Sequence, residues 1–344
     1  MAYTTIDKPT DYFNTKLYTG TGSELSLTGV NFQPDLTWIK NRDTTDSHQL
    51  VDSVRGATKN LFSNLTNAEA TDAQGLKSFD TDGFTVGTRL GMNTSGESYV
   101  GWNWLASNTT ASNTDGDITS SVSVNTTAGF SIVTYTGDGA SSATIGHGLG
   151  SAPAVLINKT RSLVGYDWNV QHKSLGATKY LYLSSTAAEA TNIGMWNNTA
   201  PTSSVFTVGT YDNVNKASET YVTYCFSEVK GYSKFGNYTG NGNADGTFIY
   251  TGFKPSFVLQ KKTSGTSDWV IYDNKRDVSN VVTQELKPNS SGAENSFTNI
   301  DILSNGFKQR ANYAYTNNSG GTYIYMAFAE NPFVTSSGVP TTAR

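Results

Sequence analysis

The chain has 344 residues and a formal net charge of −4; 15% of its residues are charged and 12% are aromatic. Few charges with many aromatic residues exclude a disordered chain, and the acidic balance gives no attraction for nucleic acid or an anionic membrane. No apolar run is long enough to span a bilayer. We therefore expect no nucleic-acid partner and no membrane insertion.

The cysteine content and the first residues bear on the compartment. Cys225 is the single cysteine, which excludes an intramolecular disulfide framework and a cysteine-based zinc cage. The first ten residues lack the apolar segment of a signal peptide. We therefore expect the chain to be made and assembled in a cytoplasm.

Three landmarks recur along the chain in the same order. A Tyr-Thr-Gly-x-Gly turn comes first, at residues 18–22, 135–139 and 238–242. A proline-led apolar strand with a lysine follows, at residues 34–40, 153–159 and 255–261. An aromatic-rich strand closes each copy, at residues 99–104, 221–226 and 323–328. The sequence therefore contains three copies of one unit.

These landmarks predict the domain boundaries. A period near 100 residues is too long for a solenoid repeat or a propeller blade. We therefore expect consecutive domains, each with its own hydrophobic core. The predicted segments are a first repeat at 1–106, a Ser/Thr/Asn-rich linker at 107–128, a second repeat at 129–232, a third repeat at 233–333 and a C-terminal tail at 334–344.

Within each repeat the pattern is that of short strands separated by Gly, Asn and Asp turns. In residues 99–104, Val100, Trp102 and Trp104 share one face of a strand. Several such strands per repeat, with no long amphipathic helix, are typical of a sandwich. The predicted fold class is all-β, with three tandem antiparallel β-sandwich domains of jelly-roll or lectin-like type.

Catalytic and metal motifs are missing from the sequence. The chain has three histidines, His48, His147 and His172, without a Gly-x-Ser-x-Gly elbow or a His-Glu-x-x-His pair. His48 and His172 follow the proline-led strand at what we take as equivalent positions. We therefore predict no catalytic residue, no metal site and no cofactor.

A glycosidase would need only two nearby carboxylates. The candidates are Asp46, Asp52, Glu69, Asp167, Glu189, Asp268, Asp273 and Glu294. Several of them recur between repeats, which favours a role in the fold over catalysis. A polysaccharide-cleaving enzyme on this scaffold stays open as an alternative.

Neutral polar and aromatic side chains are suited to binding sugars, because a ring face packs on C–H groups while amides and carboxylates bind hydroxyls. We predict glycan binding at five residues: Asp167, Trp168, Trp196, Asp268 and Trp269. The alternative is that these tryptophans pack in cores, as we expect for Trp38, Trp102 and Trp104.

Several segments of the sequence resemble segments of a known protein family. They are Gly29-Val-Asn-Phe-Gln-Pro-Asp-Leu-Thr-Trp-Ile-Lys-Asn-Arg-Asp43, Asp52-Ser-Val-Arg-Gly56, Asp82-Gly-Phe-Thr-Val-Gly87, Tyr99-Val-Gly-Trp-Asn-Trp104 and Ala327-Phe-Ala-Glu-Asn-Pro-Phe333. The chain resembles virion proteins of tailed phages of marine bacteria, notably cyanophages. Members are described as tail fibres or as structural proteins with a concanavalin-A-like lectin/glucanase sandwich.

This resemblance implies an exposed place on the virion and contacts with other tail or capsid proteins. Because the first repeat begins near residue 12 and leaves no room for a shaft, we expect a compact tail fibre, tail knob or capsid-attached appendage. We expect a homo-oligomer, such as a trimer, that attaches to host-surface glycan. The alternatives are a purely architectural capsid cement and the depolymerase named above.

Overall fold

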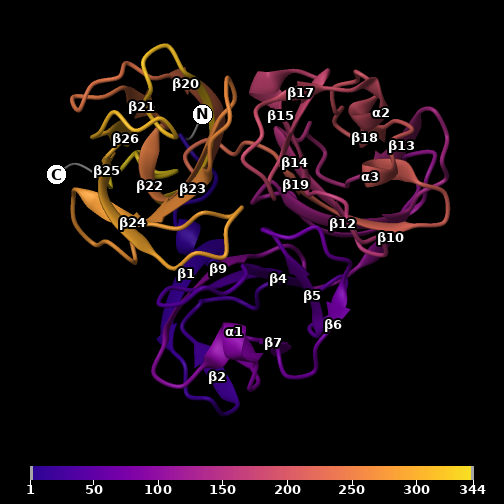
Figure 1. Cartoon of the computed structure of the whole chain (residues 1–344), viewed down its shortest axis with the longest axis horizontal. Coiled ribbons are helices and arrows are strands. Elements are labelled where there is room, and N and C mark those ends of the chain that lie inside the picture. The colour runs from indigo at the N-terminus through magenta and orange to yellow at the C-terminus, as the bar shows by residue number, and fades with distance from the viewer. Residues whose placement is uncertain (1–2, 342–344) are drawn as a thin grey trace.

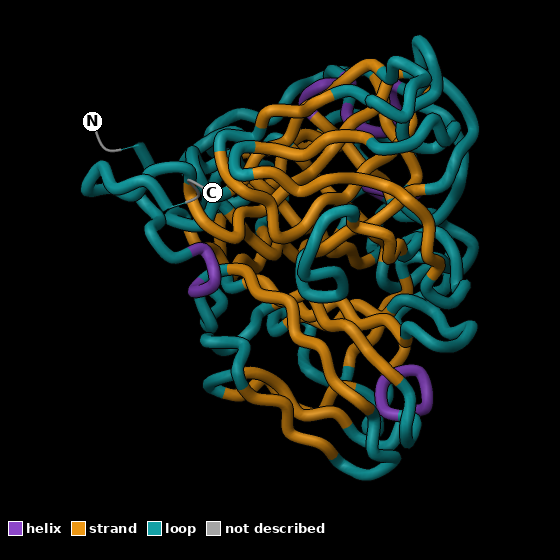
Figure 2. Tube along the Cα trace, turned by 90° about the vertical axis from the view of Figure 1, so that its left-hand side faces the viewer, coloured by secondary structure: helices purple, strands orange, loops and turns teal. Residues whose placement is uncertain are grey.

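The protein is described by a computed structural model that covers residues 3–341. Figure 1 shows three lobes around a common centre, and the colour sequence assigns one repeat to each lobe. The named strand pairs are all antiparallel, which confirms the all-β prediction. Figure 2 shows that the helices are single short turns in a body made of strands and loops.

The first repeat contains two sheets. The larger sheet has the order β1 (Phe13–Thr19), β9 (Ser98–Trp104), β3 (Leu36–Asn41), β4 (Gln49–Asp52), β5 (Lys59–Phe62) and β6 (Ala70–Thr71). The smaller sheet has the order β2 (Leu25–Thr28), β8 (Gly83–Val86) and β7 (Leu76–Asp80). Both sheets contribute apolar side chains to one cluster, which includes Leu27, Ile39, Val51 and Phe84.

The second repeat has the same plan with a wider large sheet. Its order is β10 (Ala111–Asn113), β11 (Ser120–Asn125), β12 (Phe130–Thr136), β19 (Thr220–Phe226), β14 (Val155–Thr160), β15 (Asn169–His172), β16 (Lys179–Tyr182) and β17 (Ala190–Thr191). The smaller sheet pairs β13 (Ala143–Gly146) with β18 (Val205–Val208). Strands β10 and β11 lie inside the predicted linker 107–128, so that segment extends the sheet of the second repeat.

The third repeat has two four-stranded sheets. One has the order β20 (Ser233–Thr239), β27 (Thr322–Pro332), β22 (Phe253–Lys262) and β23 (Trp269–Asp273). The other has the order β21 (Phe248–Tyr250), β26 (Gly306–Gln309), β25 (Asn295–Leu303) and β24 (Val282–Glu285). In the predicted tail 334–344, Val334 bridges to Pro340; residues 342–344 of the tail and residues 1–2 lie outside the described residues.

The helices are five short turns within residues 3–341. They are η1 (Pro9–Asp11), α1 (Leu90–Asn93), η2 (Lys173–Leu175), α2 (Ile193–Trp196) and α3 (Asp212–Asn215). None of the described helices is long and apolar enough to cross a membrane.

One strand order is common to three sheets, which we call the large sheets: the larger sheets of the first and second repeats and the β20-β27-β22-β23 sheet of the third. In each repeat the first and last strands pair, and the proline-led strand lies on the other side of the last strand. The register is also equivalent, with Trp38 opposite Trp102, Ile157 opposite Tyr224 and Leu259 opposite Met326. These pairings define which residues are equivalent between repeats.

The Tyr-Thr-Gly-x-Gly turns have a structural role. In the first repeat Tyr18 stacks on Tyr99 with ring centroids 5.0 Å apart, and its hydroxyl donates to the Met92 carbonyl. A Cβ at Gly20 would lie 2.1 Å from the Thr94 carbonyl oxygen. The other two repeats have the same tyrosine stack, at centroid distances of 5.1 and 4.9 Å. The motif therefore needs glycine because the backbone of the turn that precedes the last strand of each repeat lies against it.

The largest apolar cluster is shared by all three repeats. It contains Phe13 and Trp104 of the first repeat, Phe226 of the second, and Phe257 and Phe328 of the third. The expectation of serial domains that each own a separate core is therefore incomplete. Each repeat has an inner cluster between its own sheets, but the outer face of each large sheet packs against the other two repeats.

This arrangement explains the burial of strand β9 on both faces. Val100, Trp102 and Trp104 point to the shared core, as the alternation predicts, and Tyr99 points to the core of the first repeat. Trp38 also lies in the shared core, so Trp38, Trp102 and Trp104 are core residues as expected.

Candidate functional site

The structure places the predicted glycan-binding tryptophans Trp168 and Trp269 between repeats. Trp168 is 0% exposed and its indole N–H donates to the Phe62 carbonyl of the first repeat over 2.8 Å. Trp269 is 3% exposed and donates to the Tyr182 carbonyl of the second repeat over 2.9 Å. Neither ring offers a free face for a sugar, so these residues act as interface donors.

The other three predicted residues lie apart from one another. Trp196 is buried in the inner core of the second repeat. Asp167 accepts a hydrogen bond from Ser184, and Asp268 accepts one from Asn289, each over 2.8 Å. The structure thus does not bring the five residues into one site, and burial removes the aromatic face on which stacking depends.

The assumed equivalence of His48 and His172 is wrong by strand register. His48 directly precedes β4 and Trp168 directly precedes β15, while Trp269 is the first residue of β23. His172 ends β15 and is equivalent to Asp52 and Asp273, because each of the three lies opposite the first strand residue after the Pro-x dipeptide. Position after the proline did not align the two histidines, because His48 precedes its strand whereas His172 ends its strand.

Most of the candidate carboxylates hold the repeats together. Between the first and second repeats, Asp52 pairs with Arg55 over 2.5 Å, and both side chains are fully buried. Arg55 also pairs with Glu69, which pairs with Arg161 of the second repeat. The Tyr224 hydroxyl of the second repeat donates to Asp52 over 2.9 Å. The two arginines and two carboxylates balance in charge. Burial alone would lower the pKa of Arg55, but the charges of Asp52 and its neighbours outweigh burial, so the net shift is upward.

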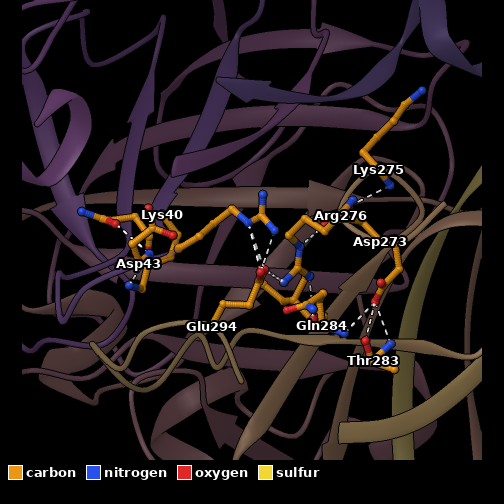
Figure 3. A network of polar contacts seen from close by, with 12 residues as sticks. Lys40, Asp43, Asp273, Lys275, Arg276, Thr283, Gln284 and Glu294 are labelled. Carbon is orange, nitrogen blue, oxygen red and sulfur yellow. Dashed lines mark hydrogen bonds and ion pairs between the residues drawn. The ribbon is translucent and has the colours of Figure 1, made fainter. Parts of the chain in front are cut away.

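The same four-residue network joins the third and first repeats. Asp273 pairs with Arg276 over 2.6 Å, and Arg276 pairs with Glu294 over 2.8 Å. The two carboxylate oxygens of Glu294 also share the Arg42 Nε–H, and one of them accepts from Arg42 Nη2. Figure 3 shows the Glu294 carboxylate beside the Arg276 guanidinium. The Trp102 indole N–H of the first repeat donates to Asp273 over 3.0 Å. Trp102 thus has the role that the Tyr224 hydroxyl has at the interface between the first and second repeats.

The interface between the second and third repeats lacks this network. His172 stands in place of the aspartate and Leu175 in place of the arginine. Across the interface, Met326 replaces the tyrosine or tryptophan donor, and Thr263 replaces the arginine. The His172 Nδ1 accepts from the Ser174 N–H, so Nε2 carries the proton and donates to the Tyr325 carbonyl over 3.2 Å. Burial lowers the pKa of His172 to about 4.

Three buried lysines occupy equivalent places at the ends of the proline-led strands. Lys40, Lys159 and Lys261 are each 0% exposed, and their ammonium groups donate to backbone carbonyls. Burial lowers the pKa of each from 10.5 to about 8, although nearby carboxylates raise it in part. No group of histidine, cysteine or acidic residues within residues 3–341 is arranged to hold a metal ion.

These lysines predict an alkaline rise in stability. The folded state releases their protons near pH 8, whereas the unfolded chain keeps them until about pH 10.5. The unfolded state therefore binds more protons between these values, and the free energy of unfolding increases with pH there. We expect an increase of about 1 kcal/mol per lysine between roughly pH 7.5 and 9.

Urea unfolding at several pH values measures this increase. The Lys159→Met variant should lose about a third of the slope, while the control Lys8→Met, at an exposed lysine, should keep it. Above about pH 10 the trend should reverse, because burial raises the pKa of tyrosines such as Tyr232 and Tyr325. A flat profile between pH 7.5 and 9 would contradict the proposed cost of these buried ammonium groups.

A cavity of about 330 Å³ opens at one end of the sandwich in the second repeat. Its lining comes from the loop before β14, the end of β15, helix η2, the loop at 200–201 and the end of β19. Ser151 lies at the mouth, two residues before the proline. The equivalent residues are Phe32 and Phe253, which are buried in the inner cores of the first and third repeats. The cavity lies where the second repeat lacks that ring.

The cavity carries polar groups with balanced charge. Gln171 is 5% exposed and lines the wall, where the equivalent Val51 and Tyr272 are core residues. Lys173 and Glu228 form an ion pair over 2.5 Å at the rim. Burial raises the pKa of Glu228, but the hydrogen bond and charge of Lys173 outweigh it, so the net shift is downward.

Sequence reasoning did not find this cavity. The sequence did contain a signal for it. The residue two places before the proline of the proline-led strand is phenylalanine in the first and third copies and serine in the second. The repeat was recognised from residues that the three copies share, and Ser151 is a position at which the second copy differs.

The fold and this cavity define an all-β protein of three repeats around a shared core, with a pocket in the second repeat. By sequence the chain belongs to the family described as a domain of unknown function (DUF7483), whose model matches residues 8–332. The match runs through all three repeats as one domain, in agreement with their shared core. A comparison with curated proteins finds no match.

Proposed function

We propose that the chain is a structural protein of a tailed-phage particle that displays lectin-like β-sandwich repeats and contributes to attachment to host-surface glycan. The observation that carries this proposal is the packing of three two-sheet repeats around one aromatic core. Such packing gives a rigid three-lobed body that presents Thr-, Asn- and Ser-rich loops, and neutral polar surfaces of this kind suit hydroxyl-rich ligands.

The finer fold assignment belongs to the same proposal. In each repeat two antiparallel sheets face each other across an apolar core, which supports a jelly-roll or lectin-like sandwich. A homo-oligomer stays a prediction. One chain already places three repeats around a centre, so a single copy supplies the three-lobed body that a trimer of one-repeat chains would form.

The carboxylates of the repeats do not favour the depolymerase alternative. Asp52, Glu69, Asp273 and Glu294 contact arginines within the inter-repeat networks. A pair of carboxylates on opposite sides of a groove, which glycoside hydrolysis needs, is not formed by these four residues.

Immunogold labelling of particles that carry this chain tests the proposal. We expect label at the tail or on an appendage, and we expect soluble protein to compete with particles for adsorption to host cells. Label spread over the capsid lattice, with adsorption unchanged by the soluble protein, would instead identify a cement protein.

A further inference from the structure

We propose that the cavity of the second repeat binds a single neutral, hydroxyl-rich ring of monosaccharide size. This inference rests on the proposed function, because it gives glycan attachment a place in the chain. It differs from the tryptophan-based site expected from the sequence, which the structure leaves buried.

The first step is that the cavity comes from two replacements at one end of one sandwich. Ser151 stands where Phe32 and Phe253 cover the ends of their repeats, and Gln171 stands where Val51 occupies the first repeat. Both replacements substitute a polar side chain for an apolar one, and both residues line the same cavity. The two replacements add a hydroxyl and an amide to a lining that is otherwise mostly small and apolar.

The second step concerns charge. Among the lining residues, the cation Lys173 and the anion Glu228 pair across 2.5 Å, while His172 is kept uncharged by burial at neutral pH. Glu228 is also paired with Lys234, which does not line the cavity, over 3.5 Å. A ligand with a net charge would have to compete with these ion pairs. A neutral ligand with several hydroxyls can donate to Glu228 and to the carbonyl of the Gln171 amide, and can accept from Lys173 and from the Gln171 N–H groups.

The third step concerns shape and size. Apart from Ser227, the remaining lining is small and apolar and consists of Ala152, Pro153, Ala154, Leu156, Gly176, Ala177, Ala200 and Pro201. These side chains offer contact to the C–H groups of a ring, although no aromatic residue is among them. A volume of about 330 Å³ is near the lower end of the roughly 300–1,000 Å³ seen for ligand pockets. The cavity therefore suits one ring, and we expect a weak Kd, on the order of 1 mM.

The alanine methyl groups provide direct reporters. We would label alanine methyls with ¹³C in the full chain and titrate it with glucose, galactose, mannose and N-acetylglucosamine to about 50 mM, well above a millimolar Kd. We expect shifts of the methyl signals of Ala152, Ala154, Ala177 and Ala200 with at least one of these sugars. Glucuronate and glucosamine serve as charged probes and should bind at least several-fold more weakly.

Two variants test the location. Ser151→Phe installs the ring that the other repeats carry, and Gln171→Val installs the residue of the first repeat; each should reduce binding at least tenfold. The control is Ser319→Phe, an exposed position in the third repeat, which should leave binding unchanged. Thermal unfolding of each variant shows that the fold is kept.

The results separate this site from the proposed function. Binding that persists in both folded variants, or the absence of shifts at all four methyls with every neutral sugar, overturns the cavity site. Tighter binding of a charged probe overturns the argument from charge. If the cavity fails while soluble protein still blocks adsorption, the proposed function stands and the glycan contact lies elsewhere. If the cavity binds sugar but adsorption is unaffected, the site stands without the attachment role.

Discussion

The Phe328→Ala variant should unfold all three repeats at a lower denaturant concentration, with a loss of about 3–5 kcal/mol in the free energy of unfolding. Phe328 is 1% exposed and contacts an aromatic ring from each repeat. The ring centroids of Phe13, Phe226 and Phe257 lie 5.1, 5.9 and 6.1 Å from it. Truncation therefore removes packing at the point where the three lobes meet.

The measurement compares two probes of urea unfolding. Circular dichroism reports on all strands, while hydrogen exchange of the backbone amides in β12 and β19 reports on the second repeat. We expect both probes to show one transition, shifted together by Phe328→Ala. If the second repeat kept its original midpoint while the third repeat unfolded earlier, the repeats would be independent domains.

Phe307→Ala is the matched control. Phe307 belongs to the same repeat and is 0% exposed, but it lies in the inner cluster of that repeat. Its truncation should be similarly costly in total. We expect it to loosen the two sheets of the third repeat first, so that hydrogen exchange rises there before it rises in the first repeat.

The second large effect is expected for Asp52→Asn. The change leaves Arg55 buried beside Glu69 alone, while Glu69 is shared with Arg161. An uncompensated buried charge typically costs about 3–5 kcal/mol, and we expect a loss of that size. Asp11→Asn, in an exposed ion pair with Lys8, should cost less than about 1 kcal/mol.

A double variant tests whether the cost comes from the unpaired charge. Asp52→His with Arg55→Leu installs the residues that the second repeat has at these positions, His172 and Leu175. Because Glu69 and Arg161 remain balanced, the double variant should be more stable than either single change, which double-mutant cycles in urea can measure. Additive losses would mean that the network stabilises the interface through more than charge balance.

The sequence was sufficient to predict the repeat and the strand type. Tyr-Thr-Gly-x-Gly and the proline-led strand marked equivalent elements, and alternation placed Val100, Trp102 and Trp104 on one face. The shared core was missed although it had a signal. Strand β9 carries Tyr99 on the face opposite Trp102 and Trp104, and an aromatic side chain on that face indicates burial on both sides.

The candidate site was harder to predict for a physical reason. A tryptophan after a loop has the same local sequence whether its ring faces solvent or a neighbouring repeat, and only the packing of repeats decided the positions of Trp168 and Trp269. The linker prediction failed similarly. Residues 107–128 are mostly polar, yet β11 pairs with both β12 and the edge strand β10, and its Val122 joins the inner cluster of the second repeat.

The covalent linkage of the three repeats has a further consequence for their evolution. In a homotrimer every substitution appears at all three junctions, so a change that suits one junction must be tolerated at the others. Here the Asp–Arg network persists at two junctions, while the third carries His172 and Leu175 beside the cavity of the second repeat. A gene with three fused copies can therefore keep two copies as scaffold while the remaining one acquires a new specificity.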